Sequence, residues 1–197
     1  IEQYPNPGFI SDFLELMQKD GFNSSARRVY VIPHFEVRRA VGLSELPRTK
    51  SELQGLFRRK LVFWFHRSIC EICHRPPRFD EWINATPTQG LNVFTVGRRE
   101  GKNMAWEPFY VGTRLEPAFD ERFTWESNKD KRIQGYIMCK LEYEYHVLDN
   151  AFLLHRPGIK RKQNKSRKMV KENDDLFTKV LIPNLRKLYG KRNVCSI

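Results

Sequence analysis

The spacing of apolar residues near the start of the chain predicts an amphipathic helix. Phe9, Phe13 and Met17 recur at four-residue spacing after a Pro-Asn-Pro-Gly turn, which is typical of a helix with one buried face. Ser11 and Asp12 are residue types that cap helices, so we expect the helix to begin there. This pattern predicts a first helix packed on a core formed by later segments.

Strands and further helices alternate along the rest of the chain. The β-branched and aromatic positions 29–32 predict a short inner strand, which Pro33 ends. Similar patterns predict a helix at 49–59 capped by Thr49 or Ser51, a strand or buried turn at 61–65, a helix at 133–141, a half-buried strand at 143–148, and a helix at 174–189 broken at Pro183. Scattered Pro and Gly at 66–103 predict a long structured loop with short strands. The alternation predicts an α/β fold.

Length and composition predict one domain over residues 1–197. The chain is 40% hydrophobic, which is enough for one sizeable core but leaves little room for two. No apolar run reaches the roughly 18 residues that a membrane span needs. The chain starts at Ile1 without an initiator Met, so we expect a fragment whose membrane anchor, if it has one, lies outside it.

The net charge of +12 favours an anionic partner such as a phosphate, a nucleic acid or an acidic sugar. Much of the excess lies at 156–171, a run with basic residues and no acid, which is typical of a solvated loop. A basic nucleic-acid-binding module is one alternative. The sequence lacks a finger, helix-turn-helix or RNA-recognition motif, so we expect no nucleic-acid partner.

The four cysteines leave two interpretations open. Cys70 and Cys73 form a Cys-x-x-Cys pair with His66 and His74 beside it, and these residue types at such spacing can bind zinc. No second pair at finger spacing follows. The other interpretation is a disulfide set of a secreted or luminal protein, which the even number permits.

Four segments in order resemble the family 49 glycosyltransferases. They are Val-Ile-Pro-His-Phe-Glu-Val-Arg-Arg at 31–39, Cys-Glu-Ile-Cys-His-Arg-Pro-Pro at 70–77, Trp-Glu-Pro-Phe-Tyr-Val at 106–111 with Phe-Asp-Glu-Arg-Phe at 119–123, and Val-Leu-Asp-Asn-Ala-Phe-Leu-Leu-His at 147–155. The resemblance covers residues 1 to about 190. It implies the C-terminal part of a catalytic domain with a GT-A-like nucleotide-sugar fold, on the luminal side of the Golgi membrane.

The resemblance also implies inverting transfer from a UDP-sugar to a glycan on a glycoprotein, with UDP-glucuronate as the first donor to test. The family's metal motif, Asp-x-Asp, aligns so that Glu2 takes the second acidic position and the first acid precedes Ile1. The cofactor would be Mn²⁺ or Mg²⁺, which neutralises the leaving diphosphate. His155, after an apolar run, is the candidate metal ligand from the far end of the chain. The alternative for His155 is a structural histidine.

Inverting transfer needs one carboxylate base and no protein nucleophile. Asp120 and Glu121 are the first candidates, because the flanking Phe119 and Phe123 could desolvate them and raise their pKa values. Glu107 is the reserve candidate for the base. Candidates for binding the diphosphate or a sugar carboxylate are Arg38, Arg39, Lys129, Arg156 and Lys160, and candidates for stacking on a sugar are Trp82, Trp106, Tyr110 and Trp125.

Two further expectations follow from the resemblance. At least one disulfide should involve Cys70 or Cys73, and the Cys-x-x-Cys loop should pack near positions 106–111. Glu2 in place of the usual acid also leaves open a catalytically inactive family member that binds a glycan or a partner.

Overall fold

The computed structural model describes residues 3–21, 23, 25–123, 130–156 and 167–195. Its strands are β1 (Gln3–Pro5), β2 (Arg28–Val31), β3 (His34–Val37), β4 (Val62–Trp64), β5 (Asn92–Gly97), β6 (Tyr110–Val111), β7 (Glu144–Asp149) and β8 (Leu153–His155). Its α-helices are α1 (Phe9–Lys19), α2 (Lys50–Arg58), α3 (Phe79–Asn84), α4 (Asp130–Lys140), α5 (Arg167–Asp175) and α6 (Ile182–Tyr189). Short 3₁₀ turns lie at Leu43–Glu45 and Gly101–Asn103.

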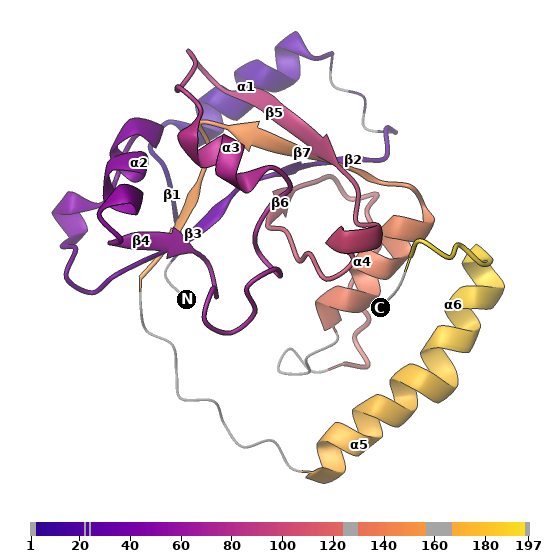
Figure 1. Cartoon of the computed structure of the whole chain (residues 1–197). Helices are drawn as coiled ribbons and strands as arrows, with labels where there is room; N and C mark the ends of the chain where they lie inside the picture. The colour runs from indigo at the N-terminus through magenta and orange to yellow at the C-terminus, as the bar shows by residue number, and fades with distance from the viewer. Residues whose placement is uncertain (1–2, 22, 24, 124–129, 157–166, 196–197) are drawn as a thin grey trace.

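The strands form two mixed sheets, which confirms the α/β class (Figure 1). One sheet has the order β1-β8-β3-β4, and the other has the order β5-β7-β2-β6. The pairs β3/β8 and β2/β7 are parallel, whereas the remaining pairs are antiparallel. The strand predicted at 29–32 is confirmed as β2, and it lies inside its sheet between β7 and β6.

Alternating side chains divide the β1-β8-β3-β4 sheet into an apolar and a polar face. The apolar face packs into the main core through Tyr4, Phe35, Val37, Val62, Trp64 and Leu154. Residues paired directly across strands share a face, and Glu36 of β3 pairs with His155 of β8. His34 lies two residues before Glu36 and so shares that face. The polar face therefore carries His34, Glu36 and His155.

Local sequence explains how the first two helices begin. α2 begins after Thr49, whose hydroxyl accepts a hydrogen bond from the Glu52 amide. The Glu52 carboxylate in turn accepts one from the Thr49 amide, so the predicted cap is confirmed. The predicted cap of α1 is wrong. α1 begins after Gly8, which has φ of 80°, and Ser11 instead donates to the Gly8 carbonyl inside the first turn.

The stretch 66–103 contains the expected strand β5 and one helix that the pattern did not predict. α3 follows Arg78, and it buries Phe79, Trp82 and Ile83 on one side. Six residues are too few to show a helical period, so only the tertiary contacts distinguish this helix from a loop.

The C-terminal helix begins earlier than predicted and contains an irregular segment. α5 passes into a π-helical segment at Leu176–Leu181, and α6 follows with Pro183 in its first turn. Proline cannot donate to the preceding turn, so the wider turn just before it agrees with the predicted break. This helix packs on α4 through Phe177, Leu181 and Leu185, and the Cys139–Cys195 disulfide links α4 to the chain after α6. Figure 1 shows α5 extending away from the two sheets.

Candidate active site

The segment at positions 106–111, Trp-Glu-Pro-Phe-Tyr-Val, lies against the Cys-x-x-Cys loop, as the sequence predicted. The Glu107 amide donates to the Cys73 carbonyl over 2.6 Å, and the Glu107 carbonyl lies 2.7 Å from Nδ1 of His74. Cys70 and Cys73 form a disulfide with each other, which confirms the prediction that at least one disulfide involves Cys70 or Cys73. The zinc alternative is therefore wrong, because two sulfurs bonded to each other are not thiolate ligands.

A histidine cluster covers the polar face of the β1-β8-β3-β4 sheet. The His34 ring stacks on Phe65 at 4.0 Å between ring centroids and meets the edge of Phe109 at 4.3 Å. His155 lies 5.1 Å from Phe65 and 6.3 Å from His34, measured between ring centroids. His66 stacks on the other side of Phe65 at 3.7 Å. With His74, four imidazoles surround one phenyl ring, and they come from β3, β8 and the loop between β4 and α3.

Burial keeps these imidazoles neutral at physiological pH. Burial lowers the pKa of His34 to about 3, and it lowers the pKa values of His66 and His74 to about 4. Burial also lowers the pKa of His155. A neutral imidazole is the form that binds a metal ion. Among the described residues, however, no three His, Cys, Asp or Glu side chains are arranged to hold one metal.

His155 meets the first requirement of its predicted role as a metal ligand. Its Nδ1 is buried and has no hydrogen-bond partner in the described part of the chain. β1 pairs with β8 so that Gln3 lies directly opposite His155. The predicted acidic motif ends at position 2, one residue before Gln3. The pairing of Gln3 with His155 therefore joins His155 to the residue that directly follows the motif. The predicted ligand Glu2 lies outside the described residues.

Three predicted anion-binding residues lie at one edge of this sheet. β3 and β8 are parallel, so their carboxyl ends share an edge. Arg38 and Arg39 follow β3 and are exposed, while Arg156 follows β8 and is partly buried. The structure thus places these three arginines just beyond the same ends of the two strands, where His155 is the last residue of β8. The predicted residues Lys129 and Lys160 lie outside the described ranges.

A cavity of about 300 Å³ lies on the other side of the 106–111 segment. Its walls include Trp106, Glu107, Phe109, Tyr110, Phe119 and Tyr145. Two of the predicted stacking residues, Trp106 and Tyr110, lie here. Trp82 is instead fully buried in the core, where its Nε1 donates to the Leu148 carbonyl over 2.9 Å. Trp125 lies outside the described residues.

Glu107 is the candidate base that lies in this cavity. Its carboxylate is mostly buried, with 16% of the side chain exposed, and it lies 3.5 Å from Nε of Arg132. Lys131 also lines the cavity. The backbone of Glu107 is fixed on the opposite side by Cys73 and His74. Phe109 both lines the cavity and contacts His34, so the cavity adjoins the histidine cluster.

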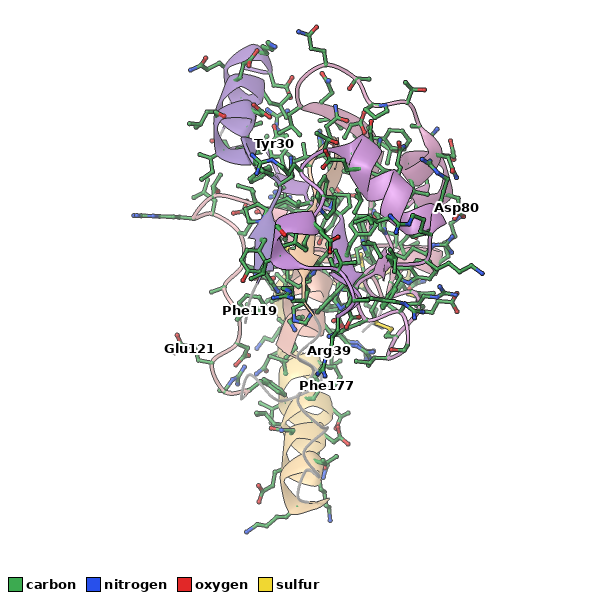
Figure 2. The ribbon with its side chains drawn as sticks, turned by 90° about the vertical axis from the view of Figure 1, so that its left-hand side faces the viewer. Tyr30, Arg39, Asp80, Phe119, Glu121 and Phe177 are labelled. Atoms are coloured by element: carbon green, nitrogen blue, oxygen red, sulfur yellow. A yellow bond between two sulfur atoms is a disulfide. The ribbon has the colours of Figure 1, made fainter. Side chains whose placement is uncertain are left out.

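The raised pKa predicted for Asp120 and the desolvation predicted for Glu121 are wrong. Asp120 accepts from Nε of Arg122 at 2.8 Å and from Nη2 at 2.6 Å, and these bonds lower its pKa instead of raising it. Phe119, expected to desolvate the pair, is 53% exposed. Glu121 is exposed, and Figure 2 shows it at the outer edge of the molecule on the loop after Phe119. Asp120 is buried about as deeply as Glu107, with 15% of its side chain exposed, but its bonds to Arg122 outweigh that burial. The role of Asp120 or Glu121 as base stays a prediction.

The sequence reasoning missed Arg99, which lines the same cavity and is 2% exposed. Arg98 and Arg99 are consecutive residues after the end of β5, and Arg99 lies at a bend. Two adjacent arginines in a loop do not indicate that either one is buried.

Comparison with known proteins identifies the family. The chain matches "Glycosyl-transferase for dystroglycan" over residues 1–190, and it therefore belongs to the family 49 glycosyltransferases. It is 30% identical to "Beta-1,4-glucuronyltransferase 1" of Danio rerio, over 79% of this chain and 35% of that protein. It is 28% identical to the Homo sapiens protein of the same name, over 79% of this chain and 35% of that protein. It is 31% identical to "Xylosyl- and glucuronyltransferase LARGE1" of Homo sapiens, over 68% of this chain and 16% of that protein.

The chain spans about a third of the length of the glucuronyltransferase relatives it matches, the aligned share being 35%. Within the part of the chain that the structure describes, no helix is both long and apolar enough to cross a membrane.

Proposed function

We propose that this chain belongs to the catalytic domain of an inverting, metal-dependent glycosyltransferase with a GT-A-like fold. It would transfer glucuronate from UDP-glucuronate to a glycan hydroxyl on a glycoprotein in the Golgi lumen, with any membrane anchor outside this chain. The observation that carries the proposal is His155, whose buried Nδ1 lacks a partner at the sheet position opposite Gln3. The two disulfides agree with an oxidising compartment.

Different residues of the site would bind the metal, the diphosphate and the sugar. Mn²⁺ or Mg²⁺, when bound, would neutralise charge on the leaving diphosphate. His155 offers a neutral nitrogen for that ion, and Arg38, Arg39 and Arg156 offer donors for phosphate oxygens. The 106–111 segment and its cavity hold the sugar and exclude water from it.

Glu107 is the base that the geometry favours. In a single displacement the acceptor hydroxyl gives its proton to the carboxylate while its oxygen bonds to the anomeric carbon. The bond from that carbon to the UDP oxygen breaks at the same time. Glu107 lines a cavity, and its ion pair with Arg132 is long at 3.5 Å. Asp120 instead forms two short hydrogen bonds with Arg122, and Glu121 faces solvent.

The metal assignment is tested with His155→Ala in the full-length protein. Loss of the nitrogen ligand should weaken Mn²⁺-dependent UDP binding and glucuronate transfer together, measured by calorimetry and by product formation. His146→Ala is the matched control, because His146 lies on β7 beside Glu144 and away from this site. Unchanged metal dependence in His155→Ala would reject the assignment. UDP binding without transfer in the wild type would instead support an inactive family member that binds a glycan or a partner.

The base is tested with Glu107→Gln, Asp120→Asn and Glu121→Gln. The variant that removes the base should keep UDP and metal binding but lose transfer by about 10²–10⁴-fold, the usual range for general-base catalysis. We expect Glu107→Gln to show this loss and the other two to stay near the wild-type rate. If Glu107→Gln retains normal turnover, the base is one of the loop acids.

A further inference from the structure

Arg99 carries a buried charge whose hydrogen-bonding capacity is largely unused. Its Nε donates to the Trp106 carbonyl over 2.8 Å. Both terminal nitrogens are buried and have no partner among the described residues. The preceding Arg98, in contrast, is exposed and forms an ion pair with Glu144 at 3.1 Å. Leaving a buried guanidinium half-satisfied is costly unless an anion binds to it.

A glycine in α4 makes room for this guanidinium. A Cβ at Gly135 would lie 2.7 Å from Nε of Arg99 and 2.8 Å from Cζ, closer than atoms of this kind can approach. The Arg99 side chain thus lies flat against the backbone of α4 and is held by the Trp106 carbonyl. Arg99 lines the cavity, and its two terminal nitrogens are the atoms that these contacts leave without a hydrogen-bond partner among the described residues.

The cavity around these nitrogens suits a ring-sized ligand with one carboxylate. Its volume of about 300 Å³ is at the lower end of the range for small-molecule sites. Of its aromatic walls, Tyr110 and Phe119 are accessible enough to stack on the C–H faces of a sugar, whereas Trp106 is 2% exposed. A guanidinium fork matches the two oxygens of a carboxylate. The Glu107 carboxylate in the same cavity disfavours a more highly charged anion such as a phosphate.

We propose that Arg99 is a specificity-determining residue that binds the carboxylate of a uronic acid in this cavity. The inference rests on the proposed function and deepens it, because it names the residue that would distinguish a uronic acid from a neutral sugar. The uronic acid can belong to the donor or to the acceptor. The carboxylate would complete the hydrogen bonds that Arg99 lacks in the described structure.

Two variants of the full-length protein change this subsite in different ways. Arg99→Lys keeps the charge but removes the fork. Gly135→Ala keeps Arg99 but displaces its guanidinium, and alanine in a helix carries no propensity penalty relative to glycine. Arg98→Lys makes the same change one residue away on the surface and is the control. Circular dichroism and thermal unfolding confirm that each variant is folded.

The readout is the preference for a carboxylate over a hydroxymethyl group. One arm compares UDP-glucuronate with UDP-glucose as donors by kcat/KM, and the other compares binding of methyl β-glucuronide and methyl β-glucoside by calorimetry. We expect Arg99→Lys and Gly135→Ala to lose about 10- to 100-fold of the preference in one arm, the value of a charge-assisted bond, and Arg98→Lys to keep it. The arm that responds identifies donor or acceptor.

Two results distinguish a failure of the inference about Arg99 from a failure of the proposed function. If the wild type transfers glucuronate and both variants keep its preference in both arms, the inference about Arg99 is overturned while the proposed function stands. If the wild type transfers no sugar but binds the glucuronide more tightly than the glucoside, and Arg99→Lys abolishes that difference, the subsite stands and the proposed function fails.

Discussion

Two buried polar regions of this molecule differ in how completely their hydrogen bonds are made. At the end of β7, buried Lys50 forms an ion pair with Asp149, which also accepts from Thr88 at 3.2 Å and from the Asn150 amide at 3.0 Å. The Lys50 ammonium lies 4.4 Å from the centroid of the Trp82 ring. Around the 106–111 segment, by contrast, His34, Arg99 and His155 keep buried nitrogens without partners.

This difference in hydrogen bonding indicates that the Lys50 region is a structural network and that the region around 106–111 is a binding site. Six of the nine buried side-chain atoms that lack a hydrogen-bond partner in the described part of the chain belong to His34, Arg99, Arg132 and His155, and of these Nε of Arg132 has an ion pair with Glu107 at 3.5 Å. These four residues surround the 106–111 segment from β3, β8, α4 and the end of β5. Unpaired buried polar groups are costly, so their concentration at one place indicates that a ligand completes them. The Lys50 network needs no ligand.

Of the tests of this contrast, acidification should have the largest effect: it should lower the free energy of unfolding through the histidine cluster. The pKa values of His34, His66 and His74 in the fold lie below the value of about 6.5 expected for an unfolded chain. The unfolded state therefore binds more protons below pH 6.5, and stability that is complete above that pH is lost as pH falls toward 4. Each such histidine adds a slope of up to about 1.4 kcal/mol per pH unit.

Urea unfolding at several pH values between 7.5 and 5 measures this slope. Buried Glu36 has a raised pKa from burial, so its single contribution has the opposite sign and reduces the total only in part. A free energy of unfolding that stays constant from pH 7 to 5 would show that the histidine cluster is already hydrated or protonated in the fold.

The sequence predicted the parts of this structure that depend on local pattern. The β-branched run at 29–32 predicted an inner strand, and Thr49 with Glu52 predicted the start of α2, because pairing and capping need only neighbouring residues. The family segments predicted the contact between the Cys-x-x-Cys loop and Glu107.

The chemistry of the site was harder to predict because it depends on where individual side chains turn. Burial was expected to raise the pKa of Asp120, but the side chain of Arg122, two residues away, turns back, binds the carboxylate and lowers its pKa. Arg99 was overlooked because arginine is usually exposed, and its burial requires Gly135 on a distant helix. Neither arrangement leaves a pattern in the sequence around the residue.

Lys50→Met should be the most damaging single substitution in the satisfied region. It leaves the Asp149 carboxylate buried without its cation, which should lower the free energy of unfolding by about 3–5 kcal/mol. Urea denaturation followed by circular dichroism measures the loss. Lys19→Met is the matched control, because the ion pair of Lys19 with Glu15 is exposed and its loss should cost less than about 1 kcal/mol.

A double variant sharpens this result. Lys50→Met combined with Asp149→Leu removes both charges, and most of the lost stability should return because no uncompensated charge remains. Equal losses in Lys50→Met and Lys19→Met would mean that the buried network contributes no more than a surface pair.

His34→Leu should have the smallest effect, and it tests the unsatisfied region directly. His34 is 3% exposed, packs between Phe65 and Phe109, and has no partner for either ring nitrogen in the described residues. An apolar replacement removes two buried nitrogens that lack hydrogen bonds and keeps most of the packing. The free energy of unfolding at pH 7 should therefore stay within about 1 kcal/mol of the wild-type value or rise. The same variant should flatten the acid dependence, because one of the four imidazoles with a lowered pKa is gone. Urea unfolding at pH 7 and 5 measures both effects in one series. A loss above about 2 kcal/mol at pH 7 would show that His34 has a strong partner in the folded protein, and the contrast with the Lys50 network would then no longer hold.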